Sequence, residues 1–261
     1  MRSLSIAATG MLAQQLNVEV ISNNIANMNT TGFKRQRAEF QDLLYQSHER
    51  VGATSSDSGT IVPSGVQIGL GVKTAAVYTI SEQGNLQSTD NQMDLAINGN
   101  GYFQILMPSG ETAYSRAGSF QLSPTGEIVT TDGYTVQPAI TIPTNAVNIT
   151  INNSGEVLVK VAGSIAEQNV GQLQLANFAN PAGLDPRGDN LFLETSASGA
   201  ATTGTPAATG YGSILQGFLE TSNVNTVTEI TNLISAQRAY EMNSKVIQTS
   251  DEMLSTINRL R

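Results

Sequence analysis

The 261-residue chain contains no cysteine and no tryptophan, and only 13% of its residues are charged. The absence of cysteine excludes disulfides, thiol nucleophiles and zinc sites built on thiolates. A net charge of −8 argues against nucleic acid and against an anionic membrane surface as partners. The chain also lacks an apolar run of roughly 18 residues, so we expect no direct membrane insertion. Gln14, Gln15 and Asn17 interrupt any apolar segment near the N-terminus, so no cleavable signal peptide is expected.

Residues that carry out catalysis or bind metals are equally sparse. His48 is the single histidine, and we expect it to be solvated in a polar loop because no Gly-x-Ser-x-Gly elbow accompanies it. Residues 69–71 (GLG) lack the third glycine of a dinucleotide fingerprint and favour a strand with close backbone approach. Asp185, Asp189 and Glu194 do not follow the spacing of a calcium loop. We therefore predict a protein that is not an enzyme and has no cofactor or metal site.

One short basic cluster stands out in this acidic chain. Lys34, Arg35 and Arg37 follow the first predicted helix. Such a cluster is more often a solvated turn than a binding patch, and we predict a solvated turn here.

Near the N-terminus, apolar residues recur every seven positions. This spacing predicts a helix over residues 4–28 with one apolar face. The repeating residues are Leu4, Met11, Val18 and Ile25, with Ala7, Ile21 and Met28 at companion positions. The Asn and Gly residues of segment 27–32 (NMNTTG) predict the end of the helix, and we expect Asn27, Gly32 and Phe33 to shape the exit.

A second long helix is predicted from Thr226 to the C-terminus. Thr226 and Glu229 have the spacing of a capping box. The seven-residue repeat consists of Leu233, Tyr240, Ile247 and Leu254, with a parallel set of Ala239, Val246, Met253 and Leu260 beside it.

Between the helices the apolar period changes to two, which predicts short strands from Val66 onward. Residues 33–46 fit a short helix or an extended segment, and residues 47–66 fit a long loop or a loosely paired hairpin. Asn98–Gly99 between two apolar runs predicts a hairpin, and residues 195–213 predict a linker. The expected fold is α+β, with long N- and C-terminal helices forming an antiparallel coiled-coil-like pair. The central, mainly antiparallel β domain is an irregular barrel or sandwich.

The apolar stripes allow two interpretations. Most apolar heptads form an intramolecular core. Here polar residues such as Gln14, Gln237 and Ser244 dilute both stripes, so we favour a seam that other copies of the molecule complete. Helices without tertiary cover are marginal, and the ends are then expected to order on assembly.

Several segments resemble the bacterial flagellar rod and hook proteins. The terminal motifs are 25–34 (IANMNTTGFK), 219–225 (LETSNVN) and 236–245 (AQRAYEMNSK), and the central ones are 94–103 and 114–120. Within this family the chain is most similar to the members that build the distal rod. The runs that carry this similarity are 33–37 (FKRQR), 42–46 (DLLYQ), 63–69 (PSGVQIG) and 137–143 (QPAITIP).

The resemblance implies a structural subunit of a rigid helical tube that crosses the periplasm and transmits torque. It implies that residues 1–30 with 226–261 form the assembly domain, 31–70 with 211–225 a connecting region, and 71–210 an outer β domain. The implied partners are further copies of the chain, proximal rod and hook proteins at the two ends, the surrounding ring proteins and the flagellar export apparatus. Two alternatives stay open: a proximal rod or hook subunit, and a monomeric β-domain binding protein with a helical stalk.

Overall fold

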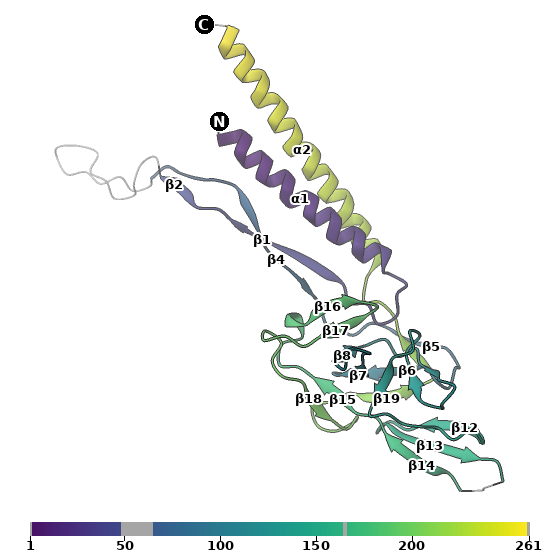
Figure 1. The fold of residues 1–261 in the computed structure, drawn as a ribbon. Helices are drawn as coiled ribbons and strands as arrows, with labels where there is room; N and C mark the ends of the chain where they lie inside the picture. Colours follow the sequence, from purple (N-terminus) through teal and green to yellow (C-terminus); the bar gives the residue numbers. More distant parts are fainter. Residues whose placement is uncertain (1, 48–64, 164–165, 260–261) are drawn as a thin grey trace. The chain divides into compact units, whose positions relative to one another are not determined.

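The computed structural model describes residues 2–47, 65–163 and 166–259. The chain forms two compact units (Figure 1). The helical unit comprises Met1–Ile25, Gln36–Tyr78 and Thr226–Arg261, and the β unit comprises Ala26–Arg35 and Thr79–Asn225. His48 and most of the predicted 47–66 loop lie outside the described residues.

Two long helices dominate the helical unit. α1 (Arg2–Ala26) has 25 residues and α2 (Thr226–Arg259) has 34. Figure 1 shows them side by side, and Asn24 and Ser3 of α1 contact Glu229 and Ser250 of α2, respectively. Because early residues of one helix meet late residues of the other, the pair is antiparallel, as predicted. Neither helix is long and apolar enough to cross a membrane.

A two-stranded ribbon completes the helical unit. β1 (Gln36–Asp42) pairs with β4 (Val72–Thr79), and β2 (Tyr45–Ser47) pairs with β3 (Gln67–Gly69). Residues 36–47 are therefore extended, which decides between the two structures predicted for residues 33–46. The backbone at Gly71 lies against Thr9 of α1, which confirms the predicted close backbone approach.

The β unit contains the remaining strands and one short 3-10 helix (Pro181–Gly183). Its strands are β5 (Leu86–Ser88), β6 (Leu95–Asn98), β7 (Tyr102–Leu106), β8 (Thr112–Ser115), β9 (Gln121–Leu122), β10 (Ile128–Val129), β11 (Thr135–Gln137), β12 (Ala146–Ile151), β13 (Glu156–Val161), β14 (Gln168–Gln172), β15 (Leu175–Asn177), β16 (Asp185–Gly188), β17 (Leu191–Leu193), β18 (Thr202–Gly204), β19 (Ser213–Gln216) and β20 (Phe218–Glu220). They pair in antiparallel fashion in open sheets, which confirms the α+β class and favours the sandwich over the barrel.

β7 is the central strand of the largest sheet. It pairs with β8 along one edge and with β15 and β11 along the other. Successive side chains of a strand point to opposite faces, and here both faces are covered. Phe103 belongs to the main apolar core with Leu95 and Val157, whereas Tyr102 belongs to a second cluster with Phe178.

Two predictions about the middle of the chain are wrong. The Asn98–Gly99 hairpin is absent from the described residues, because β6 pairs with β19 and β7 pairs elsewhere. A type I′ hairpin requires a positive φ at both central residues, and Asn98 is not among the described non-glycine residues that have one. The linker predicted for 195–213 contains β18, whose β-branched Thr202 and Thr203 extend the sheet alongside β15.

Candidate functional site

The helices meet along a seam of small and polar side chains. Glu229, Ala236, Asn243 and Ser250 of α2 recur every seven residues, and all but Asn243 are buried. A Cβ built at Gly10 of α1 would lie 2.9 Å from the Asn243 side chain, so glycine permits the close approach at this level. A search for apolar periodicity misses the α2 side of this seam, because its members are small or polar.

The predicted apolar stripes lie beside this seam. In α1, Ala7 and Ile21 are buried, Leu4, Met11, Val18 and Ile25 are half-buried, and Met28 is exposed. In α2, Tyr240 is 44% exposed, and the remaining members are half-buried: Leu233, Ile247 and Leu254. The stripes therefore line the flanks of the pair and remain partly accessible.

A groove of about 510 Å³ runs between the two helices on one flank. From α1 it is lined by Gln15, Val18 and Glu19, and from α2 by Gln237, Tyr240 and Glu241. Val18 and Tyr240 supply its apolar lining, and Glu19 and Glu241 supply carboxylates. Such a groove can accept an apolar side chain from another helix.

Other apolar side chains of α2 are exposed in the described part of the chain. The exposed ones are Val227, Ile230, Ile234, Met242, Val246, Met253 and Ile257. Single exposed apolar residues are ordinary on a soluble protein, but a series along one helix marks a surface for a partner.

The chain leaves α1 through a turn that uses the predicted residues. Asn27 O and Oδ1 accept hydrogen bonds from Thr30 N and Oγ1, respectively (both 3.2 Å). Gly32 has a φ of 69°, and a Cβ built there would lie 2.7 Å from Ala117 N. Phe33 is half-buried in the same turn.

The segment after α1 and the segment before α2 are tied together within the β unit. Gly32 N donates to Glu220 O (2.8 Å), and Asn223 N donates to Phe33 O (3.4 Å). Arg35 N donates to the Asn223 side chain (2.7 Å). Both connections to the helices are therefore held side by side.

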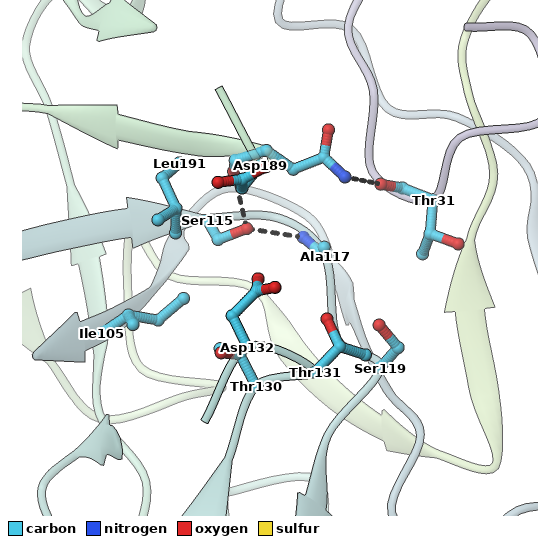
Figure 2. A pocket seen from close by; sticks show the side chains of 11 residues that line it. Thr31, Ile105, Ser115, Ala117, Ser119, Thr130, Thr131, Asp132, Asp189 and Leu191 are labelled. Atoms are coloured by element: carbon cyan, nitrogen blue, oxygen red, sulfur yellow. Dashed lines mark hydrogen bonds between the residues drawn. The ribbon is translucent and has the colours of Figure 1, made fainter. Parts of the chain in front are cut away.

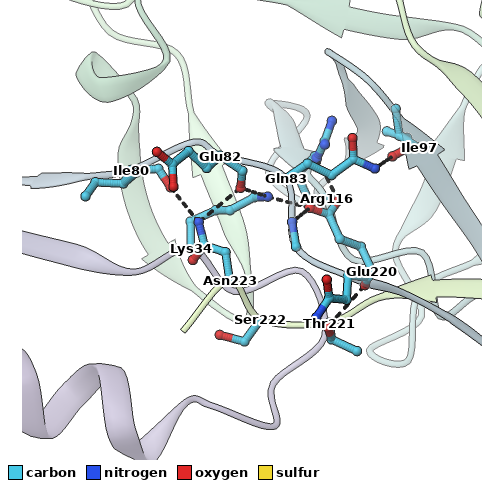
Figure 3. Close-up of polar contacts among 12 residues, drawn as sticks. Lys34, Ile80, Glu82, Gln83, Ile97, Arg116, Glu220, Thr221, Ser222 and Asn223 are labelled. Carbon is cyan, nitrogen blue, oxygen red and sulfur yellow. Dashed lines mark hydrogen bonds and ion pairs between the residues drawn. The ribbon is translucent and has the colours of Figure 1, made fainter. Parts of the chain in front are cut away.

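A buried ion cluster stabilises the contact between these two segments, here called the junction (Figure 3). Glu220 is fully buried and pairs with Lys34 through Oε1 and with Arg116 Nε through Oε2 (3.0 Å). Its Oε1 also accepts from Gly84 N (2.9 Å), and Lys34 Nζ donates to Glu82 O (2.7 Å). The prediction of a solvated turn is thus wrong for Lys34, whose ammonium is neutralised by a carboxylate 186 positions away.

Burial dominates the electrostatics of this cluster. Desolvation lowers the pKa of Lys34 from its ordinary value, and the attraction of Glu220 only partly offsets that effect. Burial likewise raises the pKa of Tyr102, whose ring lies 5.8 Å from the Arg116 guanidinium carbon. Nη1 of Arg116 also donates to the carbonyls of Gly99 and Gly101, which fixes the segment mistaken for a hairpin.

The β unit also contains a polar pocket of about 160 Å³ (Figure 2). Asn190 Nδ2 donates to Thr31 O (3.2 Å), and the Ser115 hydroxyl donates to Asn190 O (2.8 Å). The carboxylates of Asp132 and Asp189 line it, but both residues are exposed. No group of three metal-ligating side chains occurs in the described part of the chain. The hydrogen bonds hold the segment after α1 to the sheet, which is a structural role.

Comparison with known proteins defines the class. Three family models match: "Flagella basal body rod protein" over residues 4–34, "Flagellar hook protein FlgE/F/G D1 domain" over 96–159, and "Flagellar basal body rod FlgEFG protein C-terminal" over 215–260. The fold and these matches define a flagellar rod and hook protein, which is a structural class.

Full-length relatives narrow the assignment. The chain is 64% identical to flagellar basal-body rod protein FlgG of Caulobacter vibrioides, over 100% of both chains. It is 56% identical to the protein of that name from Agrobacterium fabrum and 49% identical to that from Buchnera aphidicola subsp. Schizaphis graminum, each over 99% of both chains. The chain belongs to the FlgG family of flagellar basal-body rod proteins.

Proposed function

We propose that this protein is a non-enzymatic structural subunit that self-assembles into the rigid helical tube of the distal rod and transmits torque from motor to hook. The observation that carries the proposal is the run of uncovered apolar side chains on α2, beside an open groove of the same helical unit. Burial of such a surface against further copies would stabilise a polymer by about 25 cal/mol per Å² of apolar area.

The proposal extends to domain roles and surroundings. Residues 1–30 with 226–261 form the assembly domain, 31–70 with 211–225 the connecting region, and 71–210 the outer domain. The subunit passes through the flagellar export apparatus and occupies the basal body between the motor and the outer membrane, crossing the periplasm. It contacts proximal rod and hook proteins at the ends of the tube and ring proteins around it. The full-length similarity to flagellar basal-body rod proteins supports this placement.

The test is assembly of single-residue variants at high protein concentration. Val18→Asp and Ile247→Asp place a charge in the half-buried stripes of α1 and α2, where it must be desolvated on assembly. Both variants should remain monomeric by sedimentation and electron microscopy while the wild type forms straight tubes. Near-UV circular dichroism of the tyrosines should show an unchanged β unit.

Gln248→Asp is the matched control, because it adds the same charge at an exposed polar position of α2. Normal tubes from Val18→Asp or Ile247→Asp would show that the stripes are not the assembly surface. A curved, flexible wild-type polymer would indicate a hook subunit, and a wild type that stays monomeric would indicate the stalked binding protein.

A further inference from the structure

The ribbon of the helical unit has little apolar cover of its own. Every residue of β1, β2, β3 and β4 is exposed or half-buried. A two-stranded ribbon is marginally stable in water unless it packs against another part of the chain. Contacts with the helix pair are therefore needed to keep the ribbon in one position.

Asn24 of α1 provides such a contact at the first residue of β1. Its Oδ1 accepts a hydrogen bond from Gln36 N, and its Nδ2 donates to Gln36 O, both at 2.8 Å. One side-chain amide thus binds both backbone polar groups of Gln36. The same Nδ2 donates to Oε2 of Glu229 in α2 at 3.5 Å. Because Asn24 and Glu229 are both buried, a partner that is lost here is not readily replaced by water.

A second contact between the ribbon and α1 lies about 22 Å further along the helix, at 1.5 Å per residue. Val72 N of β4 donates to Thr9 Oγ1 at 3.4 Å, and that hydroxyl donates to Ile6 O at 2.8 Å. The Thr9 contact joins two elements, α1 and β4. The Asn24 contact joins three, α1, β1 and α2.

We propose that Asn24 couples docking of the ribbon to pairing of the helices, so that the ribbon keeps its place on α1 only while α1 and α2 are paired. An asparagine amide has one oxygen that accepts and two N–H groups that donate. Gln36 N binds the oxygen, and the N–H groups bind Gln36 O and Glu229. The amide is therefore fully satisfied only when β1 and α2 are both in place. Separation of α2 would leave a donor without its acceptor and free the side chain to turn away from Gln36.

The coupling gives the ribbon a state that follows the state of the helices. Long helices that lack tertiary cover are marginal, so the pair can open in a single copy. With the coupling, opening of the pair also releases the ribbon, and a copy with a docked ribbon is one whose helices have paired. This inference concerns a single copy of the chain and goes beyond the proposed function.

Peptide-resolved hydrogen exchange on the full chain, as a dilute monomer, tests the coupling. Asn24→Leu has a similar volume and removes every hydrogen bond of the amide. Glu229→Met removes the carboxylate of α2 but leaves the two hydrogen bonds between Asn24 and Gln36 possible. In both variants, peptides that cover β1 and β4 should exchange faster than in the wild type by about tenfold or more. The double variant should exchange no faster than Asn24→Leu alone, because both residues act through one contact.

Asn232→Leu and Glu241→Met are the matched controls, because they make the same changes at exposed positions of α2 and should leave exchange of the ribbon unchanged. Far-UV circular dichroism checks that each variant keeps its helices, and Glu229→Met decides the test if Asn24→Leu does not. Wild-type exchange of the ribbon in Glu229→Met, or additive effects in the double variant, would overturn the coupling. The proposed function survives that result, because polymerisation is not measured.

Discussion

Replacement of Glu220 by Gln probes the junction that holds both helix connections. Gln has nearly the volume of Glu, so the substitution leaves the packing of β20 in place. It removes the negative charge that faces Lys34 and Arg116, whose side chains are 2% and 5% exposed. The Gln amide group also brings N–H donors to a position where the carboxylate receives hydrogen bonds from Lys34, Gly84 and Arg116.

The cost follows from the burial of the remaining charges. Removal of one partner from a buried ion pair typically destabilises a protein by about 3–5 kcal/mol. Lys34 can limit the loss by releasing its proton, since burial already lowers its pKa. Arg116 cannot do so, because a guanidinium stays charged in proteins. We therefore expect Glu220→Gln to lower the free energy of unfolding of the β unit by about 4 kcal/mol.

Urea unfolding followed by tyrosine near-UV circular dichroism measures this loss. With a slope of about 2 kcal/mol per molar urea, the midpoint should fall by about 2 M. The matched control is Glu82→Gln, since the Glu82 carboxylate pairs with Arg35 at 3.4 Å but is 70% exposed. Exposed pairs contribute about 0–1 kcal/mol, so the control should barely move the midpoint. Equal midpoints for Glu220→Gln and Glu82→Gln would refute the assignment of the cluster as a structural clamp.

Two further predictions concern the same junction. Because the pKa of Lys34 is lowered, the folded chain holds fewer protons than the unfolded chain between that lowered pKa and 10.5, so the free energy of unfolding should rise with pH in this window. The urea midpoint of the wild type should therefore rise relative to that of Lys34→Met from pH 8 to 10. Parallel curves for the two proteins would contradict the lowered pKa. Gly32→Ala should destabilise the β unit by more than the about 1–2 kcal/mol that a left-handed alanine costs, because the added Cβ would also meet Ala117 N at 2.7 Å. Gly133→Ala is the control, because Gly133 has a φ of 85° but open space around its Cβ position. If both variants lower the thermal unfolding temperature equally, the clash with Ala117 makes no contribution.

The terminal helices were predictable because their apolar period is local information. Recurrence of Leu4, Met11, Val18 and Ile25 every seven residues predicts α1 without knowledge of its partner. The surfaces that meet in the pair were not predictable in the same way. Asn243 and Ser250 belong to the seam because small side chains let two helices approach closely, and hydropathy does not report that property.

The buried ion cluster could not be predicted from the sequence, for a different reason. Lys34, Arg116 and Glu220 lie in three distant segments, and each one alone resembles a solvated surface charge. They become a buried cluster only because the fold brings Glu220 of β20 beside Lys34 and Arg116. The Asn98–Gly99 hairpin failed for the same cause, since a long-range contact with Arg116 overrides a local turn signal.

The placement of polar and apolar side chains indicates that a single copy of the chain leaves apolar helix surface exposed that further copies would cover. A monomer that used its helices as a core would turn its larger apolar residues inward. Here the seam contains Glu229, Ala236 and Ser250, while Met242 and Met253 are exposed.

The buried charges of the β unit also specify one arrangement of the chain. Ion pairs such as Lys34–Glu220 add little net stability compared with apolar packing, yet they require one specific arrangement of the segments that carry them. A subunit of a rigid tube needs both properties: apolar surface that neighbouring copies can cover, and a β unit whose segments hold one arrangement.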